Sequence, residues 1–250
     1  MTKNKDVVVK KDHLPAEITE FFDDQMAGAD KDSFAIPFLV ILQSGSPQVK
    51  RSNPGYIEGA EEGMFINTVN EALMDGFTFL PIAFKRQMIE WIPRNEGGGL
   101  VAIHSMEDCP EYEIKDIDGK QVWAMNNGHE IVDTRMHYVL HSIDDEEWAP
   151  AVLSLSKTQI KKSKRLMYML DEQRKKGNIF TFTAGTLGES KDDYTWSGWA
   201  FKAKDVVNDN ADLIAEAIRL QKAVKEGTAK ADKDGLEEAL SDTADESNNF

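Results

Sequence analysis

The sequence contains one cysteine, Cys109, among its 250 residues, which excludes an intramolecular disulfide framework and favours a reducing compartment. It contains no apolar run near the length of about 20 residues that a membrane-spanning helix needs. The first residues, Met-Thr-Lys-Asn-Lys-Asp, lack the apolar stretch of a signal peptide. We therefore expect a protein of the cytoplasm with no membrane anchor.

Motifs for catalysis or metal binding are also missing. The sequence has no Gly-x-Ser-x-Gly, no His-Glu-x-x-His and no phosphate-binding Gly-Lys-Ser/Thr loop, so residues 97–99, Gly-Gly-Gly, are better explained as a hairpin turn. His137 and His141 lie four apart on an expected strand, where this spacing does not bring two zinc ligands together as it would on a helix. Cys109 lies in an acidic loop, which would raise the pKa of its thiol and suppress its reactivity. These observations predict a protein without catalytic activity, metal or other cofactor.

Charge is distributed unevenly along the chain. The net charge of −15 argues against a protein that coats duplex DNA indiscriminately. Residues 157–176, however, contain eight bases and two acids, whereas residues 232–250 contain seven acids and one base and end at Phe250. This segregation predicts a local anion-binding surface and an acidic tail that competes for it.

Composition divides the chain into four parts. Residues 1–32 are polar and charged, and we expect a mostly disordered arm with a short helix near residues 17–26. Residues 33–205 form the expected core, and residues 206–227 contain a C-terminal helix because apolar residues recur there at helical spacing. Residues 228–250 are acidic and poor in aromatic residues, so we expect a disordered tail.

Alternation of apolar and polar residues predicts strands over most of the core. The expected strands span residues 77–91, 100–104, 121–125, 135–143, 150–156, 179–187 and 194–204, and the first is long enough to contain a bulge. A helix over residues 157–176, ended by Gly177, precedes the last two strands. The fold class is therefore mostly β with an inserted helix. This order is typical of an OB-fold-like β-barrel, in which one sheet face and the adjacent loops hold a single strand.

The inserted helix carries a candidate nucleic-acid site. Binding of single strands without strong sequence preference requires cations along the backbone path and exposed aromatic rings on which bases stack. Helical spacing places four candidates on one face, namely Lys157, Lys161, Arg165 and Tyr168. Lys164 lies beside this face, and Lys162 is a further candidate on the same helix. The alternative is a solvated basic face opposite the buried stripe of the helix.

The strands supply further candidates. Strict alternation over residues 77–91 places Phe79, Lys85, Gln87 and Trp91 on one face and Leu80, Ile82, Phe84 and Met88 on the core face. The first set mixes aromatic and polar residues, as a stacking platform would, and Arg94 follows in the next loop. Arg135 is expected to share a face with His137 and His141, opposite Met136, Tyr138 and Leu140. Trp199 and Phe201 share a face in the last strand, with Trp196 opposite. For each tryptophan, the alternative is a place in the core.

Several strings of residues resemble a widespread group of tailed-bacteriophage proteins, some of which are described as single-stranded DNA-binding proteins. The match covers residues 34–204. The strings are Tyr-Ile-Glu-Gly-Ala at 56–60 followed by Gly63, Glu-Trp-Ile-Pro at 90–93 before the three glycines, Val-Asp-Thr at 132–134 with His-Tyr-Val-Leu at 137–140, and Pro-Ala-Val-Leu-Ser at 150–154 with Thr-Gln at 158–159 and Lys-Lys-Ser at 161–163.

More distantly, the layout is similar to the podophage replication single-stranded DNA-binding protein. That resemblance implies an OB-fold core, a homodimer, and an acidic tail ending in Phe that contacts replication partners. Carried over, the partner-binding tail residues would be Glu237, Glu238, Asp242, Asp245, Glu246 and Phe250. In this chain three residues separate the acids from Phe250, and the acids are spaced rather than contiguous.

The hypothesis from the sequence is a single-stranded DNA-binding protein that supports phage DNA replication or recombination in the cytoplasm of the infected bacterium. Its tail would occupy the basic surface when DNA is absent and recruit replication proteins when DNA binds. One alternative is a phage virion or assembly protein whose basic patch binds an acidic partner. A metal-dependent nuclease or recombination accessory factor is the other alternative.

Overall fold

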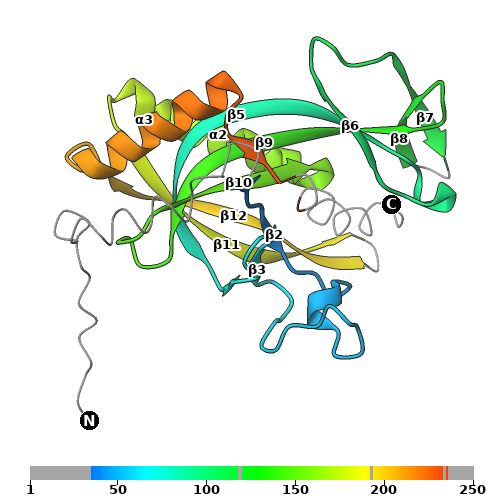
Figure 1. Cartoon of the computed structure of the whole chain (residues 1–250), viewed down its shortest axis with the longest axis horizontal. Helices are drawn as coiled ribbons and strands as arrows, with labels where there is room; N and C mark the ends of the chain where they lie inside the picture. The colour runs from blue at the N-terminus through cyan, green and yellow to red at the C-terminus, as the bar shows by residue number, and fades with distance from the viewer. Residues whose placement is uncertain (1–34, 118–119, 192–193, 233–234, 236–250) are drawn as a thin grey trace, which may run out of the picture. The chain divides into compact units, whose positions relative to one another are not determined.

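Antiparallel β-strands dominate the computed structural model (Figure 1), which describes residues 35–117, 120–191, 194–232 and 235. The described residues from 36 onward belong to one compact unit. The mostly β fold with an inserted helix and a C-terminal helix is confirmed. None of the described helices has the length and apolar character needed to cross a bilayer.

Two long strands form the spine of an eight-stranded sheet. β5 (Phe77–Trp91) pairs with β9 (Glu130–Ser142) along almost its whole length, from Thr78 opposite Ser142 to Trp91 opposite Glu130. The other strands flank this pair, in the order β12-β11-β5-β9-β8-β7, with β6 on β5 and β10 on β9. Their bounds are Leu100–Ser105 (β6), Tyr112–Ile117 (β7), Lys120–Met125 (β8), Ala149–Ser156 (β10), Phe180–Lys191 (β11) and Tyr194–Val206 (β12).

Several short strands were not predicted from the sequence. β2 (Leu39–Ile41), β3 (Phe65–Asn67) and β4 (Leu73–Met74) form a three-stranded sheet, and β1 (Ala35–Ile36) pairs with β13 (Lys230–Ala231). β7 was also missed. Two or three residues do not establish a period, and in β7 the alternation spans only residues 112–115 before Asp116 interrupts it.

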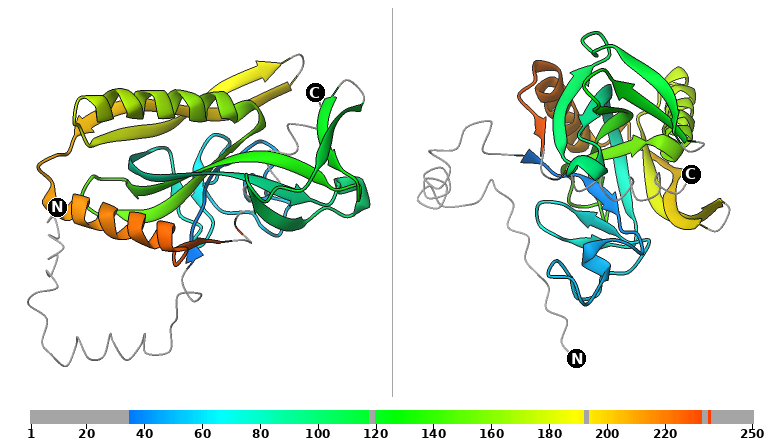
Figure 2. Two further views of the ribbon diagram at one scale, coloured as in Figure 1. Left: turned by 90° about the horizontal axis from the view of Figure 1, so that it is seen from above. Right: turned by 90° about the vertical axis from the view of Figure 1, so that its right-hand side faces the viewer.

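Two helices lie on opposite faces of the β5–β9 pair, as both views in Figure 2 show. α2 (Ile160–Lys175) follows a 3-10 turn, η4 (Lys157–Gln159), and Gly177 comes after its end with a φ of 74°. α3 (Ala211–Glu226) begins where the Asn210 side chain accepts a hydrogen bond from the Leu213 N–H, and ends at Gly227 with a φ of 70°. Left-handed backbone at these glycines terminates both helices, as the sequence predicted for Gly177.

Each helix covers its own hydrophobic cluster. The cluster on the α3 side contains, among others, Leu80, Ile82, Met136, Tyr138, Leu140, Leu213, Leu220 and Val224. The cluster on the α2 side contains, among others, Phe79, Val139, Leu153, Leu155, Leu166, Phe182, Trp199 and Phe201. His137 and His141 lie on the face opposite Met136, Tyr138 and Leu140, as predicted. Both histidines are nevertheless buried, because β9 is covered on both faces.

The expected OB-fold-like barrel does not close. The path of paired strands ends at β12 on one side and at β7 on the other. Instead of another strand, glutamine side chains satisfy part of the free edge of β12. The Gln43 amide bonds both the N–H and the carbonyl of Ser197, and Gln159 Oε1 accepts from the Trp199 N–H at 3.1 Å. Side-chain amides thus stand where a closing strand would lie.

Candidate nucleic-acid interface

The exposed face of α2 brings together four of the predicted residues. Lys161, Lys164, Arg165 and Tyr168 are all exposed, and the Tyr168 ring keeps 66% of its accessible surface. Their positions, i, i+3, i+4 and i+7, place them on one stripe of the helix. The opposite side is fixed by Ser163 and Leu166, which are fully buried against the sheet. The predicted basic face with an aromatic ring therefore exists on the surface.

Lys162, in contrast, is engaged in a local ion pair. Lys162 Nζ lies 2.8 Å from Glu189 Oε1, and its side chain is mostly buried. Burial alone would raise the pKa of Glu189, but bonds from Lys162, Gln159 and Trp196 outweigh it and hold that pKa below its ordinary value. Lys162 therefore belongs to a structural ion pair between α2 and β11.

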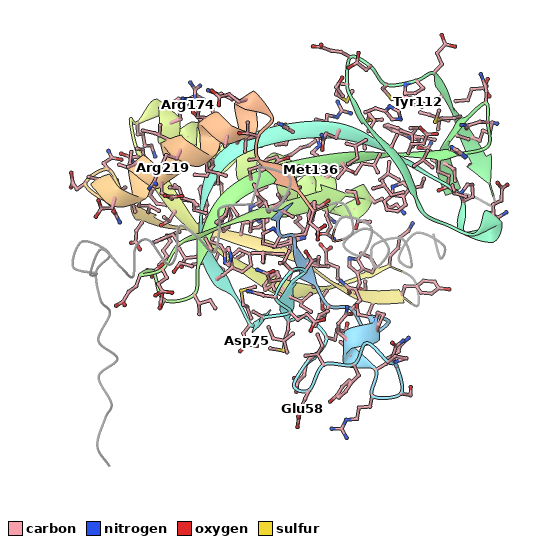
Figure 3. All side chains as sticks on the ribbon, viewed as in Figure 1. Glu58, Asp75, Tyr112, Met136, Arg174 and Arg219 are labelled. Carbon is pink, nitrogen blue, oxygen red and sulfur yellow. The ribbon has the colours of Figure 1, made fainter. Side chains whose placement is uncertain are left out.

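Both ends of the basic segment also differ from the prediction. Lys157 lies in η4 with a φ of 48°, so the α-helical spacing does not extend to it. At the other end, Arg174 and Lys175 pair with Asp171 at 2.8 and 2.7 Å. Figure 3 shows Arg174 on α2 and Arg219 on α3, on the two helices that flank the sheet. Within α2, the exposed cations without such short pairs are therefore Lys164 and Arg165, and Lys161 lies 3.6 Å from Glu189. Lys176, just after the helix, is also exposed.

A bulge in β5 overturns the predicted platform on that strand. The pairing with β9 shifts between Pro81 and Ala83, so residues after the bulge change face relative to strict alternation. Phe79 faces the α2-side cluster, whereas Lys85, Gln87 and Trp91 face the α3 side. Lys85 Nζ donates to the Val224 carbonyl at 3.1 Å and lies 5.5 Å from the centre of the Tyr138 ring.

These residues therefore do not share one stacking surface. Trp91 packs against the α3-side cluster, and the Gln87 side-chain oxygen is buried. Arg94 begins a 3-10 turn, η3 (Arg94–Glu96), and its side chain lies outside the part of the chain that the structure describes. Lys85 belongs to the contact between β5 and α3, and Gln87 and Trp91 are likewise packed on the α3 side of the sheet.

The predicted stacking role of the aromatic pair on β12 is also wrong. Trp199 and Phe201 share a face, as predicted, and their rings stack at 5.5 Å. That face, however, is the α2-side core, where Trp199 is 4% exposed and Phe201 is 7% exposed. Trp196, on the other face, is also buried and donates to Glu189. None of the three can offer a ring face to a base in this structure.

The bulge instead exposes two residues that sequence analysis assigned to the core or left unassigned. Phe84 was expected in the core, but it lies on the α2 face of β5 and is 37% exposed. Arg86, two residues on, donates twice to Asp133 at 2.8 Å, and these bonds raise the pKa of its guanidinium. Pro81, which cannot donate to a sheet ladder, was the signal in the sequence that this strand is irregular.

Phe84 and Arg86 lie beside the N-terminal half of α2. Their cross-strand partners on β9 are His137 and Arg135. His137 Nε2 lies 2.8 Å from the Ser163 hydroxyl, and Ser163 precedes Lys164 in α2. Arg135 is largely buried, and its guanidinium lies 3.8 Å from Asp133. The candidate interface is therefore the exposed α2 stripe together with Phe84 and Arg86, and we call it the α2 surface.

The predicted tail residues, from Glu237 to Phe250, lie outside the described residues, as does the helix predicted near residues 17–26. Within the described ranges, no group of three or more His, Cys, Asp or Glu side chains could hold a metal ion.

Cys109 lines a cavity of about 440 Å³, with Met88, Met106 and Tyr112 among its neighbours. The pKa of the thiol is raised, as predicted. The larger cause is burial, however, and the negative charge of Glu90 adds to it. Neither cause is the acidic loop expected from the sequence. An unreactive thiol is the expectation for such an environment.

A buried carboxylate joins three segments of the sheet beside this cavity. Glu90 on β5 is 5% exposed, and its oxygens lie 2.8 Å from His104 Nε2 of β6 and 2.5 Å from His129 Nδ1 of the turn before β9. Asn127 donates to it at 3.3 Å. Burial alone would raise the pKa of Glu90, but bonds from His129, His104 and Asn127 outweigh it and lower that pKa.

Replacing this carboxylate should loosen that end of the sheet. We expect Glu90→Gln to lower the free energy of unfolding at pH 7 by about 1–3 kcal/mol, because charge-assisted bonds are lost in a buried site. A lowered pKa contributes stability above the unfolded value of about 4.3, and that contribution is lost as pH falls through the folded value. In urea unfolding, the difference in unfolding free energy between the parent protein and Glu90→Gln should therefore be full at pH 7 and should narrow below pH ~4. An equal difference at both pH values would exclude the ionised carboxylate as its cause.

The fold and the surface define a class, a mainly antiparallel β protein that carries a basic helix across one face of its sheet. The family model described as Pam3 phage gp34-like protein matches residues 9–230, and the chain belongs to this family. It is therefore a bacteriophage protein, which agrees with the broader part of the resemblance in the sequence. No curated protein and no solved structure matches the chain.

Proposed function

We propose that this phage protein binds single-stranded DNA through the α2 surface, without catalysing a reaction on it. The observation that carries the proposal is the stripe of Lys161, Lys164, Arg165 and Tyr168 on one exposed side of α2. Lysine and arginine supply the phosphate contacts, and Tyr168 supplies a ring on which a base can stack. Replication and recombination are the processes that such binding would serve.

The charge distribution favours nucleic-acid binding at this one surface over nonspecific binding of polyanions anywhere on the protein. The chain has a net charge of −15, so nucleic acid is repelled from most of its surface and attracted where the cations of α2 are concentrated. Phe84 extends the α2 surface onto the sheet, and beside it Arg86 stays partly exposed although it is paired with Asp133. The acidic residues 232–250 would compete with DNA for this surface and, once displaced, present Phe250 to replication proteins.

Salt dependence of binding tests the proposal most directly. Binding of labelled oligo-dT, followed by fluorescence anisotropy, should weaken in Lys164→Ala/Arg165→Ala. The slope of log K against log salt should flatten by about 1.4, since each lost contact to single-stranded DNA removes roughly 0.7. Tyr168→Ala should weaken binding by about 1–3 kcal/mol with little change in slope, because stacking releases no counterions.

A matched control is available on the opposite face of the sheet. Arg219→Ala/Lys222→Ala removes the same charge from α3, where each of the two side chains is 73% exposed. We expect a slope close to that of the parent protein. Equal slopes in all three proteins would exclude α2 as the site, and equal losses in both double variants would indicate a general charge effect. Absence of oligo-dT binding by the parent protein would favour the virion or assembly role.

A further inference from the structure

β7 (Tyr112–Ile117) is the last strand on its side of the eight-stranded sheet. Among the described strands it pairs with β8 alone, and the β7–β8 hairpin lies at the end of the sheet away from α3 (Figure 1). Residues 112–116 are all exposed, and Ile114 at the centre of the strand is 58% exposed. Natural proteins usually protect such an edge, because its backbone groups can pair with another strand.

Hydrogen bonds fix which backbone groups of β7 point to the free edge. Met125 of β8 uses its N–H to bond His129 and its carbonyl to accept from Gly128, so both groups point away from β7. Met125 and its partner Tyr112 are therefore a pair that does not exchange hydrogen bonds with each other. The N–H and carbonyl of Tyr112 then point to the free edge, and two residues on so do those of Ile114.

The sequence of β7 is complementary to itself in an antiparallel pair. If a two-fold axis passes through Ile114, the two Ile114 residues face each other and can exchange both backbone hydrogen bonds. Glu113 of each copy then lies opposite Lys115 of the other. These are the closely spaced, non-hydrogen-bonded positions, where opposite charges attract across the strands.

The face that carries Ile114 adds an apolar contact. Ile114 lies opposite Trp123 of β8, and the Trp123 ring stacks on Tyr112 at 5.1 Å with an angle of 4° between their planes. Tyr112, labelled in Figure 3, thus stands on the same side of the hairpin as Ile114. In the symmetric pair, a continuous row would run from Trp123 through the two Ile114 side chains to the second Trp123. Ile114 would then be covered instead of exposed.

We propose that β7 pairs with β7 of a second copy of this chain, with Ile114 on the two-fold axis, and forms a dimer. The symmetry makes each copy contribute the same strand, as an isologous interface requires. The inference rests on the hairpin alone and is independent of nucleic-acid binding. A dimer would carry two α2 surfaces.

Charge exchange between two variants tests this register. We expect Glu113→Lys alone and Lys115→Glu alone to weaken the dimer by about tenfold or more, because each places two like-charged pairs across the axis. An equimolar mixture of these two variants should form a heterodimer, since each lysine then meets a glutamate. The double variant Glu113→Lys/Lys115→Glu should dimerise like the parent protein. Sedimentation velocity over a range of concentrations measures all four cases, with circular dichroism to verify folding.

Other results would overturn the proposal. A parent protein that is monomeric at about 100 µM, well above the Kd of an ordinary specific dimer, would exclude the interface. Dimerisation of the single variants at the parental affinity would place the interface elsewhere, as would failure of the mixed variants to associate when both are folded. Ile114→Pro gives an independent check, because it removes an N–H that points to the free edge and is not used in the β7–β8 ladder. It should abolish the dimer.

Discussion

Trp199→Ala should lower the free energy of unfolding by about 3–5 kcal/mol, the range for removing a large aromatic side chain from a packed core. The Trp199 indole lies 5.0 Å from the Phe65 ring and 5.5 Å from the Phe201 ring, centre to centre, and is almost fully buried. The helix α2 and the edge strand β12 meet at this cluster. Removing the indole therefore leaves a cavity that neighbouring rings cannot fill without moving.

Tyr168→Ala is the matched control for this experiment. Tyr168 is exposed on α2, so its loss should change stability by no more than about 0.5 kcal/mol. Urea unfolding followed by circular dichroism compares the two variants. The pair separates a core tryptophan from a surface tyrosine. A Trp199→Ala protein as stable as the parent but deficient in oligo-dT binding would reinstate the stacking role that burial argues against.

Acid should destabilise the protein from about pH 6.5 downward, because His137 is held neutral in the core. Burial, with a smaller contribution from the charge of Arg135, lowers its pKa from 6.5 to about 4. The unfolded chain therefore binds a proton below pH ~6.5 and the folded protein does not. The contribution of neutral His137 to the free energy of unfolding is therefore complete above pH ~6.5. It falls by about 3 kcal/mol in all as pH drops to about 4. Burial lowers the pKa of His141 too, which acts in the same direction.

The measurement is the free energy of unfolding in urea at several pH values between 7 and 4.5. His137→Gln can still bond the Ser163 hydroxyl but does not titrate, so its stability should vary less over this interval than that of the parent protein. The absolute stability of the variant is not the readout. Parallel curves for the two proteins would show that His137 is protonated in the folded state as readily as in the unfolded chain.

Regular elements were predictable from the sequence where they are long. The strand over residues 77–91 was predicted at its exact bounds, and both helices were predicted to within a few residues. A helix presents a fixed face whatever it contacts, so the exposed stripe from Lys161 to Tyr168 could be derived from spacing alone. Which residues share this exposed stripe depends on the geometry of the helix rather than on its tertiary contacts.

Residues on strands were harder to place, for two physical reasons. One extra residue in a strand reverses every side chain that follows, so the shift after Pro81 moved Lys85 away from Phe79 and moved Phe84 to the surface. Alternation also indicates that two faces differ, but not which of them meets water. Trp199 and Phe201 were correctly placed on one face, yet that face is buried, with Trp199 against the rings of Phe65 and Phe77.

The two hydrophobic clusters share the strand β9, and this affects how the protein unfolds. On β9, Val139 belongs to one cluster while its neighbours Tyr138 and Leu140 belong to the other. Neither cluster can therefore lose its order while the strands of the other remain in place, so within the described residues the two clusters do not form separate folding units. The described core should behave as a single cooperative unit, so that stability changes measured on either helix report on the same transition.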